Sequence, residues 1–358
     1  MKYRLKLALY WICKNLGIFH LSRALTHNKA RILCYHGFEL DDECQYVPGL
    51  FIRQEVFEQR LTYLKDKGFN VITLDQLWKS YEKGEIAKNC VVITIDDGFY
   101  SVYAVARPIL TKLQMPSTLY LTTYYYNKSS PVFTLAVRYL FWKSKRDQVA
   151  LSELDIPLVS DINPETPGDR QRHFIELICT HGQQLACNQK RLELLSQLGR
   201  LLQVDFEDIN HRRLLNLIDE RELEACRQAG IDIQLHTHRH RFPTEESGAR
   251  YEIEKNKQCL STILDYDMTH FCYPSGEWQH AHWASLQSLN IRTATTCKSG
   301  LVDIDTPRYA WNRILDSARV SQLEFEAEIM GFNELLRRGI GNLRRLVTDG
   351  HQEKNFHT

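Results

Sequence analysis

One segment constrains the fold more than any other part of this 358-residue chain, because residues 91–97 form an apolar, β-branched run that ends in two carboxylates (VVITIDD). Such a run is typical of a strand that is buried on both faces in a parallel sheet. In α/β proteins, functional side chains lie at the carboxyl ends of parallel strands. The sequence therefore predicts an α/β fold that carries Asp96 and Asp97 to the functional edge of its sheet.

A histidine-rich segment follows a second predicted strand. Residues 231–235 (IDIQL) have the strand pattern and the next five residues are HTHRH, so His236, His238 and His240 are expected at the same edge. Neutral imidazoles and one carboxylate form a ligand set that leaves a position for water on a divalent ion. The two adjacent aspartates point to different sides of an extended chain, so one can bind metal while the other accepts a proton. Either segment alone is compatible with a turn or a polar loop, and their joint occurrence favours a metal-dependent hydrolase.

These two segments resemble the first two motifs of the polysaccharide deacetylases, the NodB-homology family of carbohydrate esterases. The family's Thr-Phe-Asp-Asp-Gly motif corresponds to residues 94–98 (TIDDG), and its His-Ser/Thr-x-x-His motif corresponds to residues 236–240. The resemblance implies that Asp96 is the general base. It also implies one divalent metal, with Zn²⁺ expected, whose ligands are Asp97, His236 and His240.

The third family motif, Arg-x-Pro-x-Gly, is only partly kept. Residues 272–276 read CYPSG, so a cysteine stands where the family has the arginine that orients the base. Arg313 is the predicted substitute, because its surroundings (WNRI) are similar to the Leu-x-Arg-Ile stretch of the exopolysaccharide deacetylase branch. The alternative is an ordinary surface arginine.

The general acid is expected at the other end of the chain. No Leu-x-His motif, which carries this acid in many relatives, follows residue 314. The strand-like residues 31–35 lead into His36, and the resulting Tyr-His pair resembles the N-terminal element of the poly-N-acetylglucosamine deacetylase branch, in which the barrel order is permuted. The resemblance implies His36 as the acid, although a histidine after a strand is often structural.

Three further residues are candidates for substrate contacts. Tyr273 and Trp311 are candidates for a wall against the sugar or its acetyl group, and each is equally compatible with a place in the core. A backbone N–H near Ser275 is the expected donor to the oxyanion.

Strand patterns alternate with helical patterns before residue 124 and after residue 218, which predicts a parallel sheet. By resemblance this sheet closes into an irregular, incomplete (β/α) barrel of the NodB-homology type. The intervening segment has helical spacing without a counterpart in the family motifs, so it is interpreted as a helical insertion, either a lid or a stabilising decoration. The predicted units are an N-terminal basic helix (1–30), two barrel parts (31–123 and 219–320), the insertion (124–218), and a C-terminal helix and tail (321–358).

The N-terminal segment is basic. Residues 1–31 contain no acid and seven basic residues, namely Lys2, Arg4, Lys6, Lys14, Arg23, Lys29 and Arg31. Apolar residues recur there at helical spacing (Leu5, Leu9, Ile12, Leu16 and Phe19). Residues 1–22 are therefore predicted either to pack on the barrel or to make a peripheral membrane contact, with Lys2, Arg4, Lys6 and Lys14 toward the lipid headgroups.

Composition narrows the location and the function. The ten cysteines contain no Cys-x-x-Cys pair and indicate reduced thiols, and neither a signal peptide nor a membrane span is expected. The predicted location is cytoplasmic, or peripheral on the inner membrane face. A net charge of +1 without a basic-aromatic array argues against a nucleic-acid partner. The predicted function is metal-dependent deacetylation of N-acetylated sugars in a surface glycan or its precursor; the alternatives are an O-acetyl esterase and a catalytically inactive glycan-binding barrel.

Overall fold

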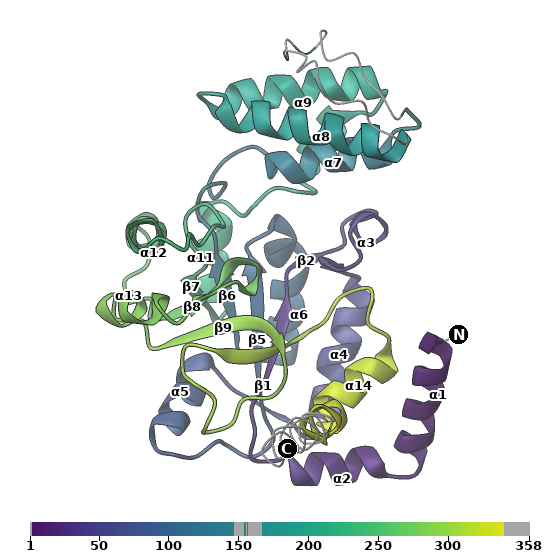
Figure 1. Cartoon of the computed structure of the whole chain (residues 1–358), viewed down its shortest axis with the longest axis vertical. Coiled ribbons are helices and arrows are strands. Elements are labelled where there is room, and N and C mark those ends of the chain that lie inside the picture. Colours follow the sequence, from purple (N-terminus) through teal and green to yellow (C-terminus); the bar gives the residue numbers. More distant parts are fainter. Residues whose placement is uncertain (1, 147–153, 155, 157–166, 340–358) are drawn as a thin grey trace, which may run out of the picture.

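A ring of seven parallel strands forms the centre of the protein (Figure 1). The computed structural model describes residues 2–146, 154, 156 and 167–339. The first strand pairs with both the second and the last strand of the ring, and this double pairing closes it. The strands of the ring are β1 (Arg31–Tyr35), β5 (Cys90–Asp97), β6 (Ser117–Leu121), β7 (Ile231–Leu235), β8 (His270–Cys272), β9 (Thr293–Ser299) and β10 (Trp311–Leu315).

The ring is irregular, as the family resemblance implies. Strands β7 and β8 share a single register pair, Leu235 with Phe271, and the register of β10 against β9 shifts between Trp311 and Arg313. A short strand, β4 (Asn70–Val71), pairs with the start of β5. A separate parallel pair, β2 (Gly37–Phe38) and β3 (Phe51–Ile52), follows β1.

Helices connect the strands of the ring and cover it. They are α3 (Glu43–Tyr46), α4 (Gln54–Asp66), α5 (Leu74–Glu82), the π-helical turn η1 (Val102–Ala106) with α6 (Arg107–Leu113), α11 (Glu220–Gln228), α12 (Glu246–Leu260), the 3₁₀ turn η3 (Pro274–Gly276), α13 (His282–Ser288) and α14 (Gln322–Ile329). Several of them begin at residues that the sequence marks as caps. Thr73, Asp219 and Ser321 each form a reciprocal capping box with a Gln or Glu three residues later, which satisfies backbone N–H groups that the first turn leaves unpaired.

A layer of helices stands beyond one end of the barrel (Figure 1). Its members are α7 (Phe133–Lys143), α8 (Pro167–Gln184), α9 (Asn188–Leu202) and α10 (Phe206–His211). Leu140, Ile178 and Leu198 belong to its own apolar core, which also includes Phe99 of the barrel. Since Phe99 directly follows the Asp-Asp-Gly segment, the layer is joined to the barrel at the carboxyl end of β5.

The N-terminal helices α1 (Lys2–Asn15) and α2 (Ile18–Leu25) lie at the outer edge of the barrel, with α1 beside α14 (Figure 1). Lys6 and Lys14 of α1 form ion pairs with Glu324 and Glu326 of α14. This corrects the expectation that both lysines face lipid headgroups, because their charges are neutralised within the protein. No helix among the described residues is long and apolar enough to cross a bilayer. Residues 340–358 of the predicted C-terminal helix and tail lie outside the described part.

Candidate metal centre and catalytic residues

Two strand ends meet at the carboxyl edge of the ring. In the register of the sheet, Asp97 of β5 lies level with Leu121 of β6, which in turn lies level with Leu235 of β7. His236 therefore emerges just beyond the level of Asp97. The chain turns sharply after both strands, with a left-handed φ of 71° at Asp97 and 65° at Thr237.

Gly98 is needed at this turn for two reasons. Its φ of 91° favours glycine, and a Cβ at this position would overlap the side chain of Leu121. The glycine of the Asp-Asp-Gly segment therefore allows β5 to turn close against β6 while Asp97 stays at the edge of the ring.

Asp97, His236 and His240 form a compact cluster of metal-ligand atoms, which lie within 4.8 Å of one another. Oδ1 of Asp97 is 3.4 Å from Nε2 of His236 and 3.3 Å from Nε2 of His240. This oxygen is buried and has no hydrogen-bond partner among the described residues. Nδ1 of His236 is 2.8 Å from the carbonyl oxygen of Cys272; since a carbonyl only accepts, Nδ1 carries the proton, and the Nε2 of the neutral ring presents its lone pair to Asp97.

This cluster fits a divalent cation. A carboxylate oxygen and two imidazole lone pairs that face one another repel unless positive charge lies between them. Burial alone would raise the pKa of Asp97, but His240 and His236 outweigh it and lower that pKa to about 2. Burial lowers the pKa of His236, but Cys272 and Asp97 outweigh it and raise that pKa above its usual range. The cluster therefore attracts positive charge, whether a proton or a metal.

Buried polar residues of α12 hold the histidine segment in place. Asn256 accepts a hydrogen bond from the backbone N–H of His236 at 3.0 Å and donates to the carbonyl oxygen of Leu121 at 3.0 Å. Glu252, one turn earlier, binds the backbone N–H and the guanidinium of Arg239. Asn256 and Glu252 are not among the residues predicted from the sequence, although two polar residues four apart on the buried face of a helix are a signal for this role.

His238 is not part of the metal-ligand cluster. Its Nδ1 lies 2.9 Å from Oγ1 of Thr123, and its ring contacts Tyr124 edge-on at 5.8 Å between centroids. These contacts turn the imidazole toward the start of the helical layer. The position between the two ligand histidines therefore serves the packing of the loop.

Asp96 lies beside the cluster and is held by Arg313. Its two oxygens accept hydrogen bonds of 2.7 and 2.8 Å from the two terminal nitrogens of Arg313, in a bidentate pair in which both side chains are buried. The Nε–H of Arg313 donates to the carbonyl oxygen of Thr296 at 2.8 Å, which fixes the guanidinium. Burial alone would raise the pKa of Asp96, but the Arg313 guanidinium outweighs it and holds that pKa below its usual range. Asp96 is therefore ionised at neutral pH.

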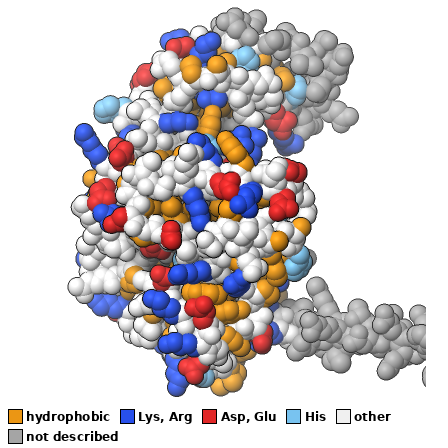
Figure 2. All heavy atoms as spheres, turned by 90° about the vertical axis from the view of Figure 1, so that its left-hand side faces the viewer, with side chains coloured by type: hydrophobic (Ala, Val, Ile, Leu, Met, Phe, Trp, Pro, Cys, Tyr) orange, Lys and Arg blue, Asp and Glu red, His pale blue; other side chains and the backbone are white. Residues whose placement is uncertain are grey.

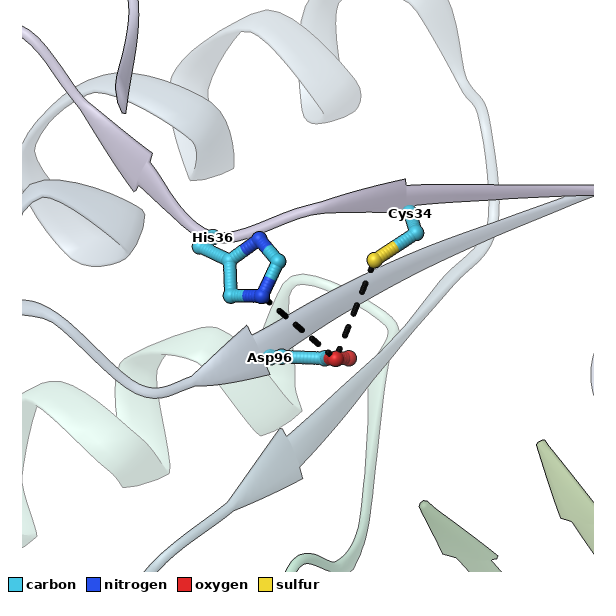
Figure 3. Close-up of side chains that lie close together, drawn as sticks. All are labelled: Cys34, His36 and Asp96. Atoms are coloured by element: carbon cyan, nitrogen blue, oxygen red, sulfur yellow. Dashed lines mark hydrogen bonds and ion pairs between the residues drawn. The ribbon is translucent and has the colours of Figure 1, made fainter. Parts of the chain in front are cut away.

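Two more side chains point toward Asp96 (Figure 3): Cys34 of β1 and His36, which directly follows this strand. Nε2 of His36 is 3.8 Å from Oδ2 of Asp96, and Sγ of Cys34 is 3.7 Å from the same oxygen. Cys272, at the motif position where the family has arginine, approaches this oxygen to 3.3 Å. The side chain of His36 is 22% exposed, in contrast to the buried thiols, so His36 is the member of this group that is accessible from solvent.

His36, Cys34 and Asp96 are close enough to bind a metal among themselves. The arginine argues against a second ion there, because the guanidinium of Arg313 already occupies both oxygens of Asp96 and would repel another cation. The geometry therefore favours a single cation, beside Asp97.

Two of the predicted substrate contacts are wrong in this structure. Tyr273 is fully buried, and its hydroxyl donates to the carbonyl oxygen of Tyr309 at 3.0 Å. Trp311 is fully buried inside the ring, where it packs edge-on against Tyr81. Neither ring offers a surface to a sugar, because each is enclosed by neighbouring core side chains.

Ser275 remains a candidate for the oxyanion donor. It is exposed at the turn after β8 and has a left-handed φ of 58°. The next residue, Gly276, has a φ of 73°, and a Cβ there would come within 2.6 Å of the backbone nitrogen of Cys297. The glycine of the CYPSG segment thus lets this turn lie directly against β9 and keeps Ser275 at the rim.

Comparison with known proteins agrees with this architecture. Residues 205–294 match the polysaccharide deacetylase family. The poly-beta-1,6-N-acetyl-D-glucosamine N-deacetylases of Escherichia coli K12 and O157:H7 are 26% identical over 92 residues, which is 25% of this chain. The match spans only 13% of the length of those relatives.

Solved structures match over most of the chain. The deacetylase PplD of Streptococcus pyogenes, in complex with acetate, has a TM-score of 0.55 at 18% identity and covers 84% of this chain and 98% of its own. IcaB from Ammonifex degensii has a TM-score of 0.53 at 15% identity, with 85% and 97% covered. A de-N-acetylase from Aggregatibacter actinomycetemcomitans has a TM-score of 0.51 at 14% identity, with 84% and 99% covered. These likenesses confirm the predicted α/β barrel.

Proposed function

We propose that this chain, whose residues 205–294 match the polysaccharide deacetylase family, is a metal-dependent deacetylase that removes acetyl groups from N-acetylated sugars of a surface glycan or its precursor. The observation that carries this proposal is that two adjacent carboxylates, Asp96 and Asp97, have different surroundings. Asp97 faces two histidines with a buried oxygen that has no hydrogen-bond partner among the described residues, whereas both oxygens of Asp96 accept hydrogen bonds from Arg313. A catalytic site of this kind needs both a ligand and an independent base.

The proposed roles follow from these positions. A divalent ion bound by Asp97, His236 and His240 would polarise the acetyl carbonyl and make water more acidic. Asp96 accepts the proton of the attacking water, because its carboxylate is ionised and fixed in one orientation by Arg313. This makes Asp96 the catalytic base and Arg313 a positioning residue.

Two further groups complete the proposed reaction. His36 protonates the leaving amine, since its side chain is partly exposed to solvent and its Nε2 lies 3.8 Å from Asp96. The backbone N–H near Ser275 donates to the oxyanion, whose negative charge develops only in the transition state. The C–N bond breaks, and the products are acetate and a free amine.

Zn²⁺ is the proposed metal. The ligand set of two imidazoles and one carboxylate contains no thiolate and suits Zn²⁺ and neighbouring first-row ions. Metal-free protein reloaded with Zn²⁺, Co²⁺ or Mn²⁺ tests this choice by the stoichiometry of binding and by the activity that each ion restores.

The test of function is acetate release from a panel of saccharides, measured with metal-loaded and metal-free protein. The panel contains N-acetylated oligosaccharides, poly-β-1,6-N-acetylglucosamine among them because the Escherichia coli relatives carry that name, and matched O-acetylated sugars. We expect metal-dependent release from an N-acetylated sugar, and none from an Asp96→Asn variant that still binds metal. Release only from O-acetylated sugars would identify an esterase. Saccharide binding without any release would identify an inactive glycan-binding barrel.

A further inference from the structure

Helix α1 has apolar side chains on both of its sides, and among the described residues only one side contacts the rest of the protein. On the inner side, Tyr10 and Cys13 are buried. The ring of Tyr10 packs edge-on against Phe332, and its hydroxyl donates to Asn333 at 2.7 Å. The ion pairs of Lys6 and Lys14 with α14 lie along the same contact. This side therefore docks α1 on the barrel.

A row of four exposed aliphatic residues lies on the other side, and we call it the outer row: Leu5, Leu9 and Ile12 of α1, and Leu16 in the turn directly after it, where the backbone N–H of Leu16 still donates to the carbonyl oxygen of Ile12. At 3.6 residues per turn these four lie within an arc of about 60° of the helix. Leu5 and Leu16 are 72% and 71% exposed, and the neighbouring Trp11 is 63% exposed. Figure 1 shows α1 at the edge of the molecule, with α14 on its inner side and no other described helix or strand beyond it.

This concentration of apolar surface is peculiar to the N-terminal helices. Among the residues that the structure describes, eight of the thirteen exposed large hydrophobic side chains lie between residues 3 and 25. On the side of α12 and α13, by contrast, basic and acidic side chains alternate over the surface (Figure 2). A contiguous patch of exposed apolar side chains from one short segment indicates an interaction surface.

The charge around the outer row identifies the kind of partner. The first acidic residue of the sequence is Glu39, so α1 and α2 contain none. Arg4 is exposed, and Lys6 and Lys14 remain about half exposed although they reach acids of α14. Tyr3 and Trp11 are also exposed, and aromatic rings of this type favour the membrane–water interface.

We infer that α1 lies in the surface of a lipid bilayer that contains anionic lipid, with the outer row in the acyl boundary and Trp11 at the headgroup level. A second copy of the chain fits less well, because pairing of the two outer rows would bring together two basic segments with no acid between them. The internal pairing of Lys6 and Lys14 makes burial of the outer row the main contribution to binding, and anionic lipid a smaller one.

Vesicle co-sedimentation of the full chain tests this inference. The probes are phosphatidylcholine vesicles with and without phosphatidylglycerol. We expect binding to the mixed vesicles and weaker binding to phosphatidylcholine alone. The double variant Leu5→Ser/Leu16→Ser should bind the mixed vesicles less tightly by a factor on the order of a hundred, because two buried leucines are lost from the interface.

A matched control separates the outer row from general loss of apolar surface. Ile304 is exposed and lies far from α1 in the sequence, so Ile304→Ser should bind vesicles like the wild type. Deacetylation of a soluble saccharide should be unchanged in all of these variants, because none of the substituted residues is near Asp96 or Asp97 in the sequence or among their contacts. This readout also shows that the variants fold.

Three results would overturn the inference. They are the absence of binding to the mixed vesicles at low salt, equal binding to both vesicle types, and a concentration-dependent dimer that Leu5→Ser/Leu16→Ser abolishes. The last result, measured by analytical ultracentrifugation without lipid, would assign the outer row to contact between two copies of the chain.

Discussion

Substitution of Arg313 by methionine is the most direct test of how the proposed base is held. Both members of the Arg313–Asp96 pair are almost completely buried, and the arginine donates to both carboxylate oxygens. Methionine retains much of the side-chain volume but removes the charge and every hydrogen bond. Removing one partner of a buried ion pair leaves the other charge uncompensated and costs about 3–5 kcal/mol of folding free energy.

The same substitution changes the titration of Asp96, and the sign can be derived from the structure. In the wild type, the folded-state pKa of Asp96 lies below its ordinary value of 3.8 because Arg313 outweighs the effect of burial. The lowered pKa means that ionised Asp96 stabilises the folded state at pH values above its unfolded-state pKa. This stabilisation is lost as the pH falls toward the folded-state pKa. Without Arg313, burial dominates and raises the folded-state pKa, so the contribution of Asp96 becomes destabilising as the pH rises above about 4.

Two assays follow from this sign change. Chemical denaturation from about pH 4 to pH 7 should show that the stability deficit of Arg313→Met grows with pH. The acid limb of the pH–rate profile for acetate release should shift to higher pH, because the variant needs a higher pH to ionise its base. Metal content should stay near the wild-type level, since Arg313 does not contact Asp97.

A double variant provides the control. Asp96→Asn/Arg313→Met contains no uncompensated charge, so it should recover part of the stability that Arg313→Met loses while remaining inactive. If Arg313→Met had wild-type stability and an unchanged pH–rate profile, the arginine would not hold Asp96 in solution. A double variant no more stable than Arg313→Met would contradict the electrostatic origin of the deficit.

The sequence predicted the parts of the fold that depend on local pattern. The run before Asp96 and Asp97 indicates a buried parallel strand because its residues are β-branched and, except for Thr94, apolar rather than alternating with polar residues, and β5 is such a strand. The cluster of Asp97 with the histidines after residue 235 could be predicted for a different reason. Parallel strands end at a common edge, so two ligand segments that each follow a strand come together without any long-range information.

The orientation of aromatic side chains near that edge could not be predicted in the same way. In a closed ring, one face of each strand points into the ring and the other points toward the covering helices. Trp311 lies inside the ring and Tyr273 lies among aromatic residues that include Phe242 and Trp278. Whether such a ring reaches solvent depends on the elements packed over it, which the local sequence does not specify.

The local sequence also does not specify whether a basic side chain is paired within the protein. The sequence predicts that Lys2, Arg4, Lys6 and Lys14 face lipid headgroups, but Lys6 and Lys14 are paired with acids more than 300 positions away. Arg31 is completely buried and donates to backbone carbonyls, including that of Ile329. The helical spacing of the apolar residues predicts that they share one side of a helix, because this grouping depends on helix geometry alone. Which side is exposed depends on the contact with α14.

Three further outcomes are expected. His236→Ala should lose the stoichiometric metal, measured by elemental analysis, because it removes one of three ligands and the one whose orientation Cys272 fixes; full metal content would contradict the site. His36→Ala should keep the metal but lower the rate of acetate release by a factor on the order of a hundred, and an undiminished rate would exclude His36 as the acid. Glu324→Gln tests the docking of α1. Burial alone would raise the pKa of Glu324, but the hydrogen bond from Lys6 outweighs it, and the pKa falls from 4.5 to about 2. A depressed carboxyl pKa contributes stability above the unfolded value, so the variant should unfold more easily at neutral pH than the wild type. This difference should shrink as the pH falls below about 4.5 and vanish near pH 2; a deficit that is constant with pH would show that the charge of Glu324 does not hold α1 in place.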